Sequence, residues 1–134
     1  YGQDQGEDKE VACLNKRKVG SNRERLAAQY LTEKGMRILE ANFRCRQGEI
    51  DLIGRHQGYL VFVEVKYRSA AEKGYALEAV DHRKQRRICR VADYYRYARG
   101  LGDETSVRYD VVGIQGSEIQ WIQNAFPHIY ARGY

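Results

Sequence analysis

Apolar residues recur along this chain with two different periods, and each period predicts one kind of element. A helical period that closes at Gly35 predicts a first helix over about Asn22–Lys34. A second helical stripe follows Asp81, a residue well suited to cap a helix, and Gly100 ends that segment. The stripes consist of Leu26, Ala27, Tyr30 and Leu31 in the first helix and of Ile88, Val91, Ala92 and Tyr95 in the second.

Shorter runs between and after these helices alternate in the way that β-strands do. Turn residues separate some of them, with Gln47-Gly48 early in the chain and Gln115-Gly116-Ser117 near its end. The expected strands are 36–45, 49–53, 59–66, 107–114 and 118–123. The predicted element order is therefore α-β-β-β-α-β-β, without an internal repeat.

The second expected strand carries two acids. A period of two places Glu49 and Asp51 on one face of this strand. Ile50 and Leu52 are expected together on the opposite face. Charged side chains on the inward faces of apolar strands are costly unless they are paired or bind a metal. The alternation therefore indicates a site at this point of the sheet.

The next strand adds Glu64 and Lys66 on one face, so its apolar stripe becomes ionic toward its C-terminal end. Phosphodiester hydrolysis requires a hard cation at the phosphoryl oxygens and an oriented water. Asp51, Glu64 and the Val65 carbonyl would supply oxygen ligands for Mg²⁺ or Mn²⁺, with Lys66 at the water. Spacing alone leaves open an exposed cluster of paired charges at a strand end.

Length and composition indicate one globular domain. We expect this domain over residues 21–134 of the 134-residue chain, behind a flexible arm over 1–20. No apolar run reaches the roughly 18 residues of a spanning helix, and the start lacks a signal peptide. We therefore expect a cytoplasmic protein with no membrane partner. The three cysteines lack metal-ligand spacing and are expected to be reduced.

Positive charge gathers in the second helix. The formal net charge of the chain is +5, whereas seven basic residues and one acid lie between His82 and Arg99. Such a run is often a solvated face, but few acids here are available to pair with it, and phosphate contacts supply most nonspecific affinity for nucleic acids. The residues expected to bind nucleic acid are Arg83, Lys84, Arg86, Arg87 and Arg90.

Three other polar features have plainer interpretations. Asp110 lies in an apolar strand, where we favour a buried partner of an arginine over a site residue. The eleven tyrosines are expected mainly at core edges, with a stacking platform for single strands as the alternative. The three histidines lack ligand spacing and are expected at the surface or in ordinary hydrogen bonds.

Taken together, the charged strands resemble a known signature. An Asp followed by a Glu-x-Lys, with Glu64 thirteen positions after Asp51, is similar to the pattern of restriction-endonuclease-like nucleases. The stretch from residue 24 to about 114 resembles the YraN-like family of uncharacterised bacterial proteins. The features that carry this resemblance are Glu24, Ala28, Tyr30, Gly48–Ile53, Val63–Lys66, Arg68, Lys84 and Arg108–Val112.

The resemblance implies an α/β fold of the restriction-endonuclease-like type, a mixed central sheet flanked by helices. It also implies similarity to archaeal Holliday-junction resolvases, in which a glutamate of the first helix joins the strand carboxylates. By that analogy Asp51 and Glu64 would be metal ligands, with Lys66 positioning the water. Glu24 would be an accessory acid and Glu49 a partner of Asp51. The residue before Asp51 is an isoleucine, where many restriction enzymes have proline.

The expected function is that of a Mg²⁺- or Mn²⁺-dependent endonuclease that hydrolyses phosphodiester bonds of DNA, with branched or otherwise structured DNA as a candidate substrate. The resolvase analogy also suggests a homodimer, although no heptad repeat supports one. The alternative is a noncatalytic nucleic-acid-binding or assembly module that keeps the nuclease fold. Asp51, Glu64 and Lys66 together favour the enzyme, because the lysine has no evident structural use.

Overall fold

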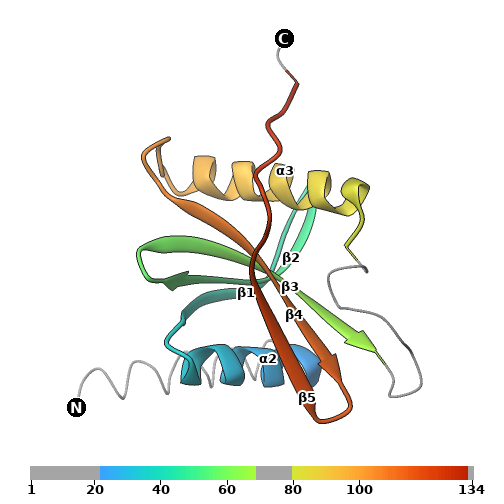
Figure 1. Ribbon diagram of the computed structural model, residues 1–134. Helices are drawn as coiled ribbons and strands as arrows, with labels where there is room; N and C mark the ends of the chain where they lie inside the picture. The colour runs from blue at the N-terminus through green and yellow to red at the C-terminus, as the bar shows by residue number, and fades with distance from the viewer. Residues whose placement is uncertain (1–21, 69–79, 133–134) are drawn as a thin grey trace, which may run out of the picture.

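A computed structural model describes residues 22–68 and 80–132 of the chain (Figure 1). Its elements follow the predicted order α-β-β-β-α-β-β. The expected arm over residues 1–20 lies outside the described residues. The elements are α2 (Asn22–Glu33), β1 (Arg37–Cys45), β2 (Gly48–His56), β3 (Tyr59–Arg68), α3 (His82–Ala98), β4 (Val107–Gln115) and β5 (Glu118–Phe126).

The five strands form one mixed sheet in the order β1-β2-β3-β4-β5. β3 and β4 pair in parallel, and the other three neighbouring pairs are antiparallel. α3 lies between the two parallel strands in the chain, as a parallel crossover requires. The β2–β3 hairpin turns at Gln57 and Gly58, whose φ angles are 51° and 84°. Positive φ at both turn residues matches the twist of a tight hairpin. The expected mixed α/β architecture is confirmed.

The two described helices cover opposite faces of the sheet, with α3 and α2 on either side of the strands in Figure 1. On the α2 face, Ala27 and Leu31 pack into one apolar cluster with residues of the central strands. On the α3 face, the predicted stripe of Ile88, Val91, Ala92 and Tyr95 is buried in a second cluster. Cys89 joins that cluster as a free, buried thiol. The core is thus divided between the two faces of one sheet.

One expectation about strand faces is wrong. Ile50 and Leu52 do not share a face, because Ile50 packs in the α3-side cluster and Leu52 in the α2-side cluster. The neighbouring strand changes face at the same level, since Ala41 pairs with Leu52 and packs on the α2 side, whereas Phe43 packs on the α3 side. Between them Asn42 has a left-handed φ of 50°, which breaks the regular alternation. Asp51 therefore lies between two β2 residues that face opposite sides of the sheet, at the point where the regular alternation is interrupted.

The surroundings of Asp110 confirm its interpretation as a buried partner of an arginine. This carboxylate is 1% exposed, and Arg108 donates to both of its oxygens at 2.9 Å. The Trp121 indole and the Asn124 amide donate to it as well, at 2.8 and 2.9 Å. His56, itself buried, contacts the Arg108 guanidinium at 2.9 Å. Asp110 is a fully satisfied structural charge on β4.

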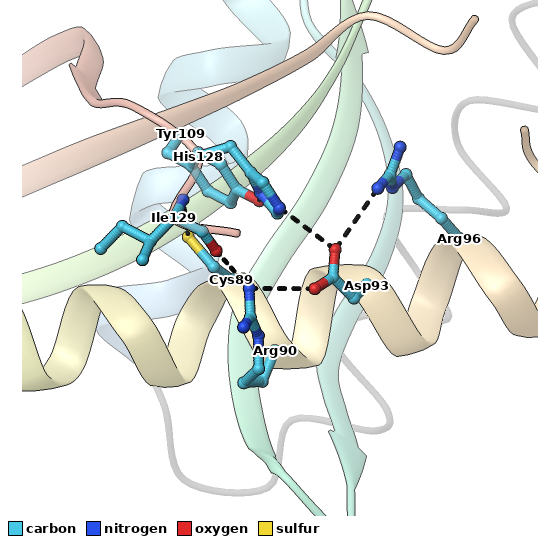
Figure 2. A network of polar contacts seen from close by, with 7 residues as sticks. All are labelled: Cys89, Arg90, Asp93, Arg96, Tyr109, His128 and Ile129. Atoms are coloured by element: carbon cyan, nitrogen blue, oxygen red, sulfur yellow. Dashed lines mark hydrogen bonds and ion pairs between the residues drawn. The ribbon is translucent and has the colours of Figure 1, made fainter. Parts of the chain in front are cut away.

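The chain that follows β5 is tied to α3 by a second polar network (Figure 2). His128 lies between the Tyr109 hydroxyl, at 2.6 Å from Nδ1, and Asp93, at 3.3 Å from Nε2. Burial lowers the pKa of His128, so at neutral pH its Nε2–H donates to Asp93 and its Nδ1 accepts from Tyr109. Arg90 donates to the Ile129 carbonyl and pairs with Asp93 at 3.0 Å.

Neither described helix is long and apolar enough to cross a membrane.

Candidate functional site

Two cavities open at the level of Asp51, one on each face of the sheet. The cavity on the α3 side has a volume of about 360 Å³, and the cavity on the α2 side about 190 Å³. The first is lined by Arg44, Cys45, Gly48, Glu49, Asp51, Glu64, Lys84, Arg87 and Ile88. The second is lined by Arg23, Glu24, Asp51, Val65 and Tyr67. Asp51 lines both cavities because the side chains of β2 change face at this residue.

The Asp51 carboxylate is held in place by β3 and crowded by other acids. Its Oδ2 accepts a hydrogen bond of 2.7 Å from the Val65 amide. Burial raises the pKa of Asp51 to about 8, and the charge of Glu64 and the neighbouring Glu24, which also hydrogen-bonds to it, add to that rise. The Val65 hydrogen bond acts in the opposite direction but is outweighed. Asp51 is therefore protonated at neutral pH unless a cation is near.

Glu64 is a buried charge with two basic partners. Its residue is 6% exposed, and its Oε2 lies 3.3 Å from the Lys66 ammonium and 3.0 Å from the Lys84 ammonium. Lys66 comes from the same strand, two positions further on, as the alternation predicted. Lys84 comes from the first turn of α3, on the covering layer. A buried carboxylate needs such partners, because an unpaired charge there would cost several kcal/mol.

The contact of Lys84 with Glu64 was missed by sequence reasoning, which assigned this lysine to the basic face. Burial works against the ammonium, but its hydrogen bond with Glu64 and attraction to Glu64 and Asp51 raise the pKa of Lys84 overall. A signal was present in the helical period, since Lys84 lies four positions before Ile88 and extends the stripe that faces the sheet. The polar character of the residue concealed that position.

The two remaining predicted acids also lie at this end of the sheet. Glu49 lines the same cavity as Asp51, and its carboxylate pairs with Arg44 at 2.6 Å, near the surface. Glu24 reaches Asp51 from α2, through the smaller cavity. The structure thus brings Glu24, Glu49, Asp51, Glu64 and Lys66 to one region, from three different elements.

The basic residues predicted on one face of α3 have different surroundings in the structure. Arg83, Arg86 and Arg87 are exposed, and Arg87 also lines the larger cavity. A Cβ at Gly48 would come within 3.1 Å of the Arg87 side chain, so the glycine allows the helix to approach β2 closely. Arg90 departs from the expectation of an almost unpaired face, because Asp93 and the Ile129 carbonyl engage its guanidinium (Figure 2). Arg90 serves the attachment of the C-terminal segment.

The donor set suits a divalent cation of the magnesium type. Among residues 22–68 and 80–132, no three acidic, histidine or cysteine side chains form a ready metal cage. Mg²⁺ is nevertheless commonly bound through one or two carboxylates while it keeps several waters. Asp51 and Glu64 line one cavity, and burial together with the charge of Glu64 raises the pKa of Asp51, so a cation placed there would favour its ionised form. Two hard oxygen donors therefore fit such an ion.

Comparison with known proteins gives one consistent result. A family model described as "Uncharacterised protein family UPF0102" matches residues 23–114. A UPF0102 protein of Lachnoclostridium phytofermentans is 50% identical over 113 residues, which cover 84% of this chain and 96% of that protein. A UPF0102 protein of Photobacterium profundum is 46% identical over 114 residues, 83% of this chain and 91% of that protein. For a UPF0102 protein of Stutzerimonas stutzeri the identity is 42% over 111 residues, with 80% and 92% covered. The matched stretch contains every acid and lysine described above.

Proposed function

This chain belongs to the UPF0102 family, and from the geometry of its site we propose that it is a metal-dependent endonuclease that hydrolyses phosphodiester bonds of DNA. The observation that carries the proposal is the convergence of the Asp51 and Glu64 carboxylates on one cavity, with two lysines at Glu64. These four ionisable groups, gathered at the end of an apolar sheet, carry a cost in folding free energy. A catalytic role accounts for that cost.

Each residue has a chemical role in this proposal. Asp51 and Glu64, with the Val65 carbonyl, would hold Mg²⁺ or Mn²⁺. The ion would stabilise charge on the phosphoryl oxygens and supply an activated water. Lys66, whose ammonium is 3.3 Å from Glu64, would orient that water. Glu24, beside Asp51, would be the accessory acid, and Glu49 would support the same cavity together with its partner Arg44.

The partner of this site would be the backbone of a nucleic acid. The exposed Arg83, Arg86 and Arg87 lie on the helix that borders the cavity, so phosphates bound there would be close to the carboxylates. Contacts of this kind position a strand without reading its bases. Branched or otherwise structured DNA is the candidate substrate implied by the resemblance to resolvases, which also suggests a homodimer.

A second function has a specific observation in its favour. Glu64 already has two lysine partners, so its burial is balanced without any metal. A noncatalytic nucleic-acid-binding or assembly module would need nothing more than that. The crowding of Asp51 by Glu64 and Glu24 supports the enzyme over this alternative, because active sites often hold buried acids close together.

A cleavage assay separates the two functions. Duplex, single-stranded, flap and four-way-junction DNA would be incubated with the protein in Mg²⁺ or Mn²⁺ and in chelator. We expect metal-dependent cleavage of at least one substrate and its loss in Asp51→Ala. Asp103→Ala is the matched control, since Asp103 is an exposed acid in the loop after α3. DNA binding by the wild type without metal-dependent cleavage of any substrate would favour the noncatalytic module.

A further inference from the structure

Lys84 differs from Lys66 in how it reaches Glu64. Lys66 stands two positions away on the same strand, so the strand itself holds the two side chains together. Lys84 crosses from α3 to β3, and its ammonium makes the shorter contact, 3.0 Å against 3.3 Å, with the same oxygen Oε2. A residue of the covering helix thus neutralises a carboxylate that is proposed to bind a metal.

The backbone of Lys84 is fixed, whereas its side chain has room to move. The Lys84 amide donates a hydrogen bond of 2.8 Å to the Asp81 cap of α3. The Lys84 side chain is 34% exposed, compared with 7% for Glu64. A lysine carries its ammonium on a flexible four-carbon stem, so the charge can shift by rotation of the side chain while the helix stays in place.

Resting on the proposed nuclease function, we propose that Lys84 is the exchangeable partner of Glu64. Its ammonium balances the buried carboxylate in the metal-free protein. When a divalent cation is bound at Asp51 and Glu64, Lys84 leaves Glu64 and contacts a phosphate of the nucleic acid in the larger cavity. Lys84 thereby balances the charge of Glu64 in the metal-free protein and positions a phosphate in the metal-bound protein.

Charge balance and the cavity lining support this exchange. Without metal, removal of Lys84 would leave Glu64 with less compensation in a buried position. A divalent cation beside Glu64 would repel an ammonium held at 3.0 Å from the same carboxylate. Arg44 and Arg87 line the same cavity as Lys84, together with Glu49, Asp51 and Glu64, and Arg44 is paired with Glu49 at 2.6 Å. A divalent cation bound at Asp51 and Glu64 would offset those two acids and leave Lys84 and Arg87 available to a phosphate in this cavity.

The first test measures metal binding rather than activity. Thermal melting would be followed in chelator and in a Mg²⁺ titration for the wild type, Lys84→Gln and Arg87→Gln. We expect Lys84→Gln to melt below the wild type in chelator and to need about tenfold less Mg²⁺ for the same rise in melting temperature, because no Lys84 ammonium competes for Glu64. Arg87→Gln removes the same charge from the same cavity without a contact to Glu64. It should need a Mg²⁺ concentration close to that of the wild type.

The second test measures the phosphate contact. Binding of a duplex oligonucleotide with a phosphorothioate backbone, chosen to slow cleavage, would be compared in chelator and in Mg²⁺. Lys84→Gln should weaken binding by about tenfold in Mg²⁺ and little in chelator, where Lys84 is engaged by Glu64. Arg87→Gln should weaken binding in both conditions. Lys84→Arg, which keeps the charge, should restore the melting temperature in chelator.

The outcomes distinguish this inference from the function on which it rests. If Mg²⁺ stabilises the wild type but Lys84→Gln requires the same concentration, Lys84 is a fixed structural partner and the inference is overturned. If Lys84→Gln weakens DNA binding equally with and without metal, the exchange is likewise overturned. If Mg²⁺ does not stabilise the wild type at all, both the metal site and the exchange of Lys84 fall.

Discussion

Asp110 and Asp51 are acids of neighbouring regions of one sheet, and their surroundings differ completely. Asp110 is buried among donors, with an arginine, an indole and a backbone amide directed at its two oxygens. Asp51 accepts a hydrogen bond from Val65 but faces two other acids, and its pKa is raised to about 8. A satisfied charge serves the fold, whereas a buried acid crowded by other acids marks a candidate functional site.

The largest expected effect lies at Asp110. Asp110→Ala would leave the Arg108 guanidinium buried beside His56 without its carboxylate, and we expect a loss of about 3–5 kcal/mol in the free energy of unfolding. Denaturant unfolding would measure it, with Asp103→Ala as the exposed control. A loss no larger than that of the control would mean that the two regions do not differ as described.

Asp51, unlike Asp110, is expected to make the folded protein less stable as pH rises. Its folded pKa, about 8, lies above the ordinary value of 3.8, so burial favours its protonated form. The stability that Asp51 contributes is therefore fully present below pH 4 and is lost as pH rises through about 8. In chelator Asp51→Asn should match the wild type near pH 4 and become progressively more stable than the wild type as pH rises toward 9.

The control for this pH experiment is the difference between the two proteins, which removes the titration of groups that do not interact with Asp51. Melting curves of the wild type and Asp51→Asn at several pH values would supply it. If Asp51 is instead half of a stabilising ion pair, the asparagine variant will melt lower than the wild type at neutral and alkaline pH. That result would place Asp51 in the same class as Asp110.

A smaller effect is expected from metal. Because only the folded protein presents Asp51 and Glu64 together, Mg²⁺ should stabilise it by about 2.7 kcal/mol at a hundredfold excess over the dissociation constant. This corresponds to a rise of several degrees in the melting temperature for a chain of this size. Asp51→Asn should abolish most of the rise. An equal rise in both proteins would assign the ion to another place on the molecule.

The smallest expected effect concerns the basic face. Reversal of Arg83, Arg86 and Arg87 to glutamate should weaken DNA binding similarly for all sequences and flatten its dependence on salt. Folding should survive, because these three side chains are exposed. Addition of Arg90→Glu should instead lower stability, since Arg90 holds Asp93 and the C-terminal segment. Unchanged affinity and salt slope in the triple variant would make this face an ordinary solvated surface.

Local patterns were enough to predict most elements and several residues of the candidate site. Helical and strand periods, the Asp81 cap and the turn residues act over a few positions, so the order of elements could be predicted without knowledge of the fold. The shared face of Glu64 and Lys66 follows in the same way from the period of a strand. The buried role of Asp110 could be inferred because an acid in an apolar strand requires a partner.

Tertiary structure alone decided how these parts meet. The change of face between Ile50 and Leu52 depends on pairing with a strand that bends at Asn42, which no period within β2 records. The contact of Lys84 with Glu64 requires α3 to cross the sheet at one particular height, twenty positions further along the chain. Such contacts join residues that are distant in sequence. Their effect on the free energy of folding therefore depends on how the helices pack against the sheet.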